Sequence, residues 1–151
     1  MENRISPLEL RLQRRFDAPV ERVWRAWTDP QALMRWFGPA GTQRVLLAET
    51  DVRVGGAYEV GFITADGGEH YASGRYQEVA LHRRLVFTWA WRDSPERESL
   101  VTVALVPTPG GTRMDFLHEQ FVDQAERDDH EGGWLPTVDK LGRYLQANAA
   151  A

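Results

Sequence analysis

The stretch RLVFTWAW, residues 84–91, decides the fold class, because a large apolar side chain recurs at every second position. Leu85, Phe87, Trp89 and Trp91 fall on one face of an extended chain, since successive side chains of a strand point to opposite faces. The alternation therefore predicts a strand that packs one face against an aromatic interior.

Alternation of the same kind continues on both sides of this stretch. Glycine-rich segments such as ADGG at 65–68 and PTPGG at 107–111 separate the alternating runs and indicate hairpin turns. The other strands that we predict are LELRLQRRF (8–16), TQRVLLAE (42–49), AYEVGFIT (57–64), EHYASGRYQEV (69–79), SLVTVALV (99–106) and RMDFLHEQF (113–121). Hairpins between consecutive strands imply an antiparallel meander with one solvent-exposed face.

Two short helices are predicted after the first strand. In VERVWRAW (20–27) the apolar residues recur at helical spacing, and Pro19 suits the first helical position. In PQALMRWF (30–37) either Thr28 or Asp29 is placed to cap the helix, and Gly38 followed by Pro39 ends it.

A longer helix is predicted near the C-terminus. Asp123 and Glu126 have the spacing of a capping box, so this helix should begin near Gln124. Pro136 cannot donate a hydrogen bond to Gly132, and its ring crowds that carbonyl group. We therefore expect a break or kink at 132–136, before a main helix from about residue 134 to 146. The apolar stripe of that helix is formed by Trp134, Val138, Leu141 and Leu145.

Composition narrows the class of protein. The chain has 151 residues, which is the size of one domain, so residues 1–151 are taken as a single domain. A formal net charge of −4 gives no reason to expect nucleic acid as a partner. The absence of cysteine excludes disulfides and thiolate metal sites. No apolar run is long enough to span a membrane, so we expect no membrane association and a cytoplasmic location.

The pair His-Glu occurs twice, at 118–119 and at 130–131. A zinc-protease helix would need a second histidine four residues after the first, and those positions hold Val122 and Trp134. His118 and His130 can still converge, with a third ligand from Glu119, Asp128, Asp129 or Glu131. Acidic residues at a helix start more often serve as partners of the helix dipole, so we expect no metal. His130 is expected to be exposed and to stack toward Trp134.

His118 is predicted to face inward with Met114 and Phe116, because the three residues share one face of their strand. One interpretation is a core histidine whose nitrogens are satisfied by a backbone group or a tyrosine hydroxyl. The other is a polar group inside a pocket that orients a ligand or moves a proton. The sequence leaves both open.

Other catalytic motifs are missing. There is no G-x-S-x-G motif, and the glycine pairs form neither a phosphate loop nor a dinucleotide fingerprint. We therefore expect no cofactor.

Aromatic residues carry the main indication of function. A strongly bent sheet of about seven strands has a concave face wider than one helix can fill, and large curved sheets commonly hold small ligands. The residues predicted to line such a cavity are Trp36, Phe37, Tyr58, Phe62, Tyr76, Phe87, Trp89, Trp91, Met114, Phe116, His118 and Trp134.

Four motifs resemble one known family in order and spacing: APVERVWRAWTDPQALMRWFGP (18–39), DVRVGG (51–56), LVFTW (85–89) and the segment from LHEQF through HEGGW to YL (117–145). Together they resemble the activator-of-Hsp90-ATPase-like branch of the START/Bet v 1-like SRPBCC superfamily. The resemblance covers about residues 8 to 147.

The resemblance implies an α+β helix-grip fold, in which a seven-stranded antiparallel sheet wraps around a long C-terminal helix and two short helices follow the first strand. It also implies a hydrophobic cavity between sheet and helix. Members of the superfamily bind lipids, sterols, polyketides or hormones, and a few cyclise, hydrolyse or isomerise the bound molecule. The eukaryotic co-chaperones that name the branch carry an additional N-terminal domain that these residues do not contain.

Three functions follow as hypotheses. The first is binding of a small hydrophobic or aromatic molecule, such as a lipid-like or polyketide-like metabolite, by a monomer or homodimer. The second is an enzyme acting on such a ligand with His118 as acid or base. The third is a co-chaperone or stress-response interaction protein, which would present a contiguous exposed apolar patch.

Overall fold

The computed structural model describes residues 8–147. Seven strands and three helices follow one another along the chain, as the sequence predicts. Their bounds are β1 Leu10–Phe16, α1 Val20–Thr28, α2 Pro30–Trp36, β2 Thr42–Thr50, β3 Ala57–Thr64, β4 Glu69–Ala80, β5 Arg84–Trp91, β6 Ser99–Thr108, β7 Gly111–Glu119 and α3 Gln124–Ala147.

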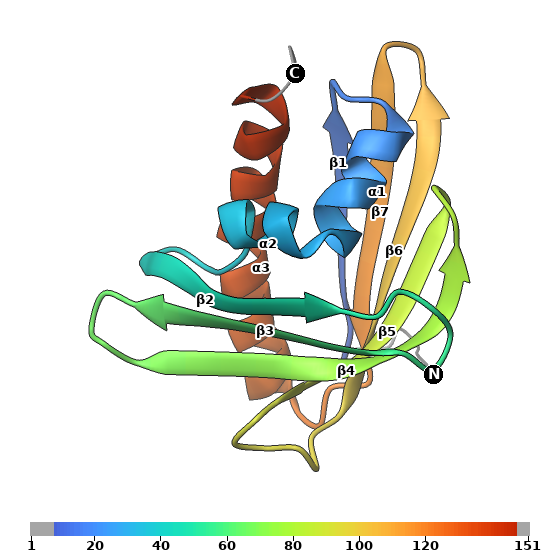
Figure 1. The fold of residues 1–151 in the computed structure, drawn as a ribbon. Coiled ribbons are helices and arrows are strands. Elements are labelled where there is room, and N and C mark those ends of the chain that lie inside the picture. Colours follow the sequence, from blue (N-terminus) through green and yellow to red (C-terminus); the bar gives the residue numbers. More distant parts are fainter. Residues whose placement is uncertain (1–7, 148–151) are drawn as a thin grey trace.

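The strands form one antiparallel sheet in the order β1-β7-β6-β5-β4-β3-β2. Strands β2 to β6 each pair with the next strand along the chain, whereas β1 pairs with β7 and forms the edge opposite β2. The connection through α1 and α2 carries the chain across the sheet between these edges. Figure 1 shows the sheet curling around α3, with α1 and α2 beside it. The fold is the helix grip that the motifs imply.

The predicted faces of the strands are confirmed. On β7, Met114, Phe116 and His118 are all buried, whereas the intervening residues are more exposed. On β5, Leu85, Phe87 and Trp89 are buried, and Trp91 at the strand end is half-buried. The inward side chains meet α1, α2 and α3 in a single core.

The short helices confirm most of the predicted boundaries. Asp29 caps α2, since its Oδ1 accepts a hydrogen bond from the backbone N–H of Gln31 at 3.0 Å, and Pro30 takes the first helical position. The other helix, α1, begins one residue later than predicted, because Pro19 is its N-cap and remains extended. Trp24 and Trp27 face the core, as their spacing predicts.

The start of α3 is confirmed at Gln124. The Oδ1 atom of Asp123 accepts a hydrogen bond from the backbone N–H of Glu126 at 2.8 Å. The Glu126 carboxylate in turn accepts one from the backbone N–H of Val122 at 2.9 Å. Two backbone donors ahead of or within the first turn are therefore satisfied by side chains.

The predicted break at 132–136 is wrong, because α3 continues without interruption to Ala147. Pro136 removes one backbone hydrogen bond, but the Gly132 carbonyl that loses it belongs to an exposed residue and can bond to water. The next carbonyl, that of Gly133, accepts a hydrogen bond from Thr137 Oγ1 at 2.6 Å. Burial of the apolar stripe then holds the helix against the sheet through Trp134, Val138, Leu141 and Leu145.

Candidate functional site

The structure sorts the predicted ligand-binding residues into three groups. An open pocket of about 100 Å³, called the mouth pocket below, is bordered by Phe37, Phe62, Trp89, Trp91 and Trp134. An inner hollow of about 20 Å³ is lined by Tyr58, Tyr76 and Phe87, and it shares Phe37, Trp89 and Trp134 with the mouth pocket. The remaining predicted residues, Trp36, Met114, Phe116 and His118, line neither space and are packed in the core.

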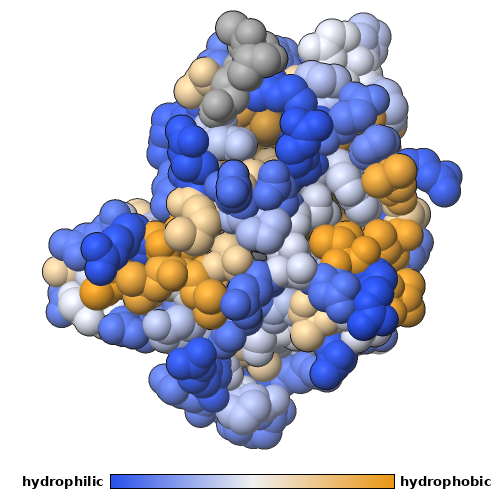
Figure 2. Space-filling view, in the orientation of Figure 1, coloured by the Kyte–Doolittle hydropathy of each residue, from blue (hydrophilic) through white to orange (hydrophobic). Residues whose placement is uncertain are grey.

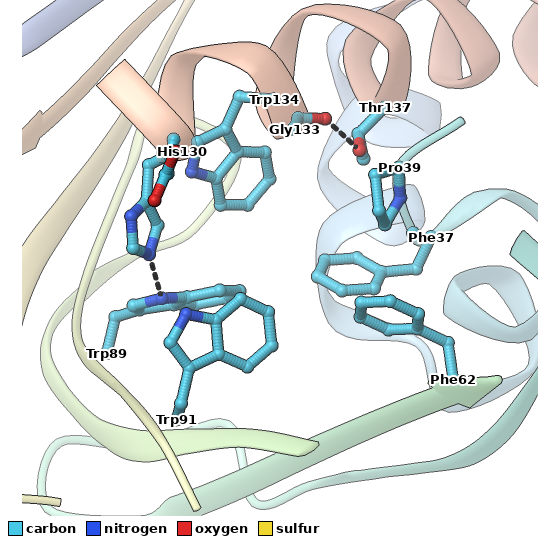
Figure 3. A pocket seen from close by; sticks show the side chains of 11 residues that line it. Phe37, Pro39, Phe62, Trp89, Trp91, His130, Gly133, Trp134 and Thr137 are labelled. Atoms are coloured by element: carbon cyan, nitrogen blue, oxygen red, sulfur yellow. Dashed lines mark hydrogen bonds between the residues drawn. The ribbon is translucent and has the colours of Figure 1, made fainter. Parts of the chain in front are cut away.

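Five aromatic rings form a closed circuit around the mouth pocket. Successive ring centroids lie 6.1 Å apart for Phe62 and Trp91, 5.4 Å for Trp91 and Trp89, 5.2 Å for Trp89 and Trp134, 6.0 Å for Trp134 and Phe37, and 6.2 Å for Phe37 and Phe62. Figure 3 shows the three tryptophans on one side of the opening and the two phenylalanines on the other. The rings come from β3, β5, α3 and the residue after α2, so only the folded chain assembles them.

His130 on α3 fixes the tryptophan at the base of this pocket. Trp89 Nε1–H donates a hydrogen bond to His130 Nε2 at 3.2 Å. An indole nitrogen can only donate, so Nε2 is the accepting nitrogen and Nδ1 carries the proton of the neutral ring. That proton points to the carbonyl oxygen of Glu126, 2.8 Å away and one helical turn earlier. Both nitrogens of His130 are therefore occupied, and the ring lines the mouth pocket (Figure 3).

His118 on β7 makes a second histidine–tryptophan pair with the opposite tautomer. Trp134 Nε1–H donates to His118 Nδ1 at 3.0 Å. The proton of the neutral ring therefore sits on Nε2, which lies 2.7 Å from Ser99 Oγ and donates to it. The hydroxyl group of Ser99 in turn donates a hydrogen bond to the carbonyl oxygen of Trp89 at 3.3 Å. Every polar atom in this chain of hydrogen bonds has a partner.

Burial determines the charge of His118. The side chain is 0% exposed, and desolvation lowers the pKa of His118 well below its ordinary value, with a smaller contribution in the same direction from His130. A proton added to Nδ1 would also displace the Trp134 hydrogen bond. The ring is therefore neutral, and of the two interpretations the hydrogen bonds favour the satisfied core histidine. Its partners are an indole and a serine, rather than the backbone group or tyrosine expected.

The expectation that His130 is exposed is wrong. It is partly buried, and its ring lies 5.0 Å from that of His118 and 5.0 Å from that of Phe121. The two histidines do converge, but the nitrogen atoms point to indoles, a serine and a carbonyl group. Within residues 8–147, no group of three His, Cys, Asp or Glu side chains is arranged to hold a metal ion.

The rim of the mouth pocket carries few polar side chains. Asp129 and Thr137 on α3 contribute a carboxylate and a hydroxyl group, and Gly38 and Pro39 close the opposite side. Lys140, one turn further along α3, donates to the carbonyl oxygen of Phe37 at 3.3 Å and does not line the pocket. Partial burial lowers the pKa of Lys140, with a smaller effect from Arg143.

The inner hollow contains one unsatisfied donor. Trp27 lines this hollow, and its Nε1–H is buried without a hydrogen-bond partner. Trp36 differs, because its Nε1–H donates to the carbonyl oxygen of Ala26 at 2.9 Å. Less than 1 Å² of the Trp27 nitrogen is accessible, so an acceptor can reach it only if neighbouring side chains move.

Sequence reasoning missed several residues of the site: Trp27, Gly38, Pro39, Asp129, His130, Gly133 and Thr137. A helical projection would have placed His130, Trp134 and Thr137 on one face, since they are spaced four and three residues apart. The assumption of a break at Pro136 obscured that face. No local signal indicates that Pro39 packs beside Gly133 and Thr137 of this helix at the rim of the pocket.

A family model described as "Activator of Hsp90 ATPase homolog 1-like protein" matches residues 17–146, which is most of the chain. The chain belongs to this family. The match agrees with the four motifs and places the protein in the SRPBCC superfamily. No curated protein sequence matches the chain significantly.

Solved structures of similar proteins support the assignment. Protein NE0264 from Nitrosomonas europaea has 26% sequence identity and a TM-score of 0.83, with 98% of this chain and 100% of that chain covered. Protein CV1439 from Chromobacterium violaceum has 31% identity and a TM-score of 0.79, covering 91% of this chain and 96% of that one. DynU16, a putative protein in the dynemicin biosynthetic locus, has 26% identity and a TM-score of 0.75, covering 91% of this chain and 47% of that chain.

Proposed function

We propose that this member of the activator-of-Hsp90-ATPase-like family binds a small hydrophobic or aromatic molecule in the mouth pocket. The observation that carries the proposal is the closed circuit of five aromatic rings around an open space of about 100 Å³. Pockets of ligand-binding proteins are concave, mostly apolar and furnished with a few polar groups, as this one is. The similarity to DynU16, whose gene locus is a biosynthetic one, supports a metabolite as ligand.

The size of the pocket limits what binds without rearrangement. An apolar cavity of about 150 Å³ holds one benzene molecule, so the present space suits a group of one ring or smaller. A longer ligand must move the rings of Phe37, Trp89 and Trp134, which separate the mouth pocket from the inner hollow.

The hydrogen bonds of His118 argue against the enzyme hypothesis in its original form. Both ring nitrogens are occupied, the side chain is buried, and it does not line the mouth pocket. A general acid or base must come within hydrogen-bond reach of its substrate. His118 therefore supports the pocket by holding Trp134, and we do not propose a catalytic role for it.

Binding can be tested with a library of small hydrophobic and aromatic compounds, followed by tryptophan fluorescence and thermal melting. Trp91→Phe and Trp24→Phe form a matched pair, because Trp24 lies on α1 against His82 and lines neither space. We expect a hit to raise the melting temperature, and its fluorescence change to be reduced by Trp91→Phe but kept in Trp24→Phe. A library in which no compound changes either signal would refute the proposal.

The surface favours a second proposal, that of a protein partner. Figure 2 shows two apolar areas on one face, one over β2 and one around the β2–β3 loop and the β4–β5 hairpin. Val54 and Leu81, in that loop and that hairpin, are each 65% exposed. If two copies of the chain associate through the area around Val54 and Leu81, the variant Leu81→Asp should weaken that association. Sedimentation at increasing protein concentration measures the degree of association. Sedimentation as a monomer at every concentration, with no effect of the variant, would speak against a homodimer formed there.

A further inference from the structure

Two of the three indole groups of the mouth pocket, those of Trp89 and Trp134, have their N–H donors turned away from the space. Trp89 gives its donor to His130 and Trp134 gives its donor to His118. These rings can therefore offer a ligand only their π systems. Neighbouring rings are inclined to one another, with interplanar angles from 50° for Trp89 and Trp134 to 87° for Phe37 and Trp134. Such an arrangement presents aromatic surface to a bound group from several directions.

The charge at the rim of the mouth pocket is negative. Among residues 8–147, no arginine or lysine lines the mouth pocket, although the chain contains 18 of these residues. The ammonium group of Lys140 on α3 donates a hydrogen bond to the Phe37 carbonyl oxygen, and this side chain does not line the mouth pocket. The ionised side chain on the rim is the carboxylate of Asp129.

Asp129 differs from its acidic neighbours on α3. Asp128 accepts hydrogen bonds from Gln124 and Arg127, and Glu131 pairs with Arg127 at 2.8 Å. Asp129 makes no hydrogen bond or ion pair with any residue in the range 8–147, and it is exposed. One carboxylate in this acidic turn is thus left without a cation, at the edge of the aromatic circuit.

We propose that the mouth pocket is an aromatic cage for a small organic cation, such as a quaternary or methylated ammonium group. The inference rests on the proposed binding function and specifies its ligand class. A cation within about 6 Å of several ring centroids is attracted by the quadrupole of each ring. The unpaired carboxylate of Asp129 adds a Coulomb attraction at the entrance. The mouth pocket is open to solvent, so a compact trimethylammonium group can enter it while the rest of the molecule stays outside.

The test compares two molecules of the same shape and different charge. Choline carries a trimethylammonium group, and 3,3-dimethylbutan-1-ol has a carbon atom in place of the nitrogen. Both are titrated into the whole chain, with calorimetry and tryptophan fluorescence as readouts. We expect choline to bind about tenfold more tightly than the neutral alcohol, because only choline gains the cation–π attraction.

Two variants separate the carboxylate from its surroundings. Asp129→Asn should weaken choline binding about threefold to tenfold and leave the neutral alcohol unaffected. Asp128→Asn is the matched control, since Asp128 already has two partners, and it should change neither affinity. Trp91→Leu should weaken choline binding more than it weakens binding of the neutral alcohol.

The outcomes distinguish this inference from the function on which it rests. Equal or tighter binding of the neutral alcohol overturns the cation cage and leaves a general apolar pocket. The cage is also overturned if neither molecule binds while uncharged library compounds do. If those compounds fail as well, the proposed binding function falls together with the cage.

Discussion

The two histidine–tryptophan pairs lie 5.0 Å apart, measured between their imidazole rings, yet they belong to regions with opposite properties. At the closed end of the interior, His118 is fully buried beside Ser99 and Phe121, and every polar atom of its hydrogen-bond chain is satisfied. At the mouth pocket, His130 holds Trp89 beside an open space.

The contrast teaches that the same pair of residue types serves two purposes. The pair of His118 and Trp134 fixes the packing of α3 against β7, since neither side chain can leave without exposing an unsatisfied group, and its Trp134 also borders the mouth pocket. The pair of His130 and Trp89 holds one wall of the mouth pocket in place. If the histidine is removed, water or a ligand in the pocket can accept the hydrogen bond of Trp89. The position in the fold, and not the chemistry of the pair, decides whether the histidine borders the mouth pocket.

The largest expected effect tests whether the two regions differ in packing. Phe116→Ala at the closed end should lower the free energy of unfolding by about 3–5 kcal/mol, because it leaves a cavity against Trp27 and Trp134. Trp91→Ala at the mouth pocket should cost only about 1–2 kcal/mol, because its ring is already partly in water. Urea unfolding measures both, and equal losses would show that the mouth is packed as firmly as the closed end.

A smaller effect is expected from the histidines themselves. His118→Ala should cost about 2–4 kcal/mol, since the buried Nε1–H of Trp134 loses its acceptor and a cavity remains. His130→Ala should cost about 1 kcal/mol, because water from the mouth pocket can accept the hydrogen bond of Trp89. Thermal melting or urea unfolding measures the loss of stability in each of the two variants. A larger loss for His130→Ala would reverse the comparison.

The smallest effect is a dependence of stability on pH. Because burial lowers the pKa of His118, only the unfolded chain binds a proton there as the pH falls below about 6.5. The contribution of the neutral ring is therefore complete above that pH and is lost progressively below it, by at most about 1.4 kcal/mol per pH unit. Urea unfolding at about pH 7.5 and pH 5.5 measures the slope.

The variant His118→Gln should flatten this dependence, since glutamine does not titrate. Phe116→Leu is the control, because it alters packing at the closed end and keeps the titrating group. If the free energy of unfolding of His118→Gln falls with pH as steeply as that of the unmodified protein, other titrating groups cause the loss of stability at low pH.

Much of the fold was predictable from the sequence, and the site was predictable only in part. Alternation gave the buried faces of β5 and β7, and spacing gave Gln124 as the start of α3 and left Thr28 and Asp29 as candidates for the cap of α2, which proved to be Asp29. The aromatic character of the pocket followed from the same faces. The continuity of α3 through Pro136 did not follow, because local propensity disfavours a proline there and tertiary burial of the apolar stripe outweighs it.

The sequence by itself determined which side chains point inward, because that property depends on the period of a single strand or helix. Only the tertiary structure decided which inward residues border open space and which are enclosed. His130 and Trp89 are 41 positions apart, and Phe37 faces Trp134 across almost 100 residues. Their meeting depends on how the sheet curls around α3, and no spacing within one element encodes that curvature.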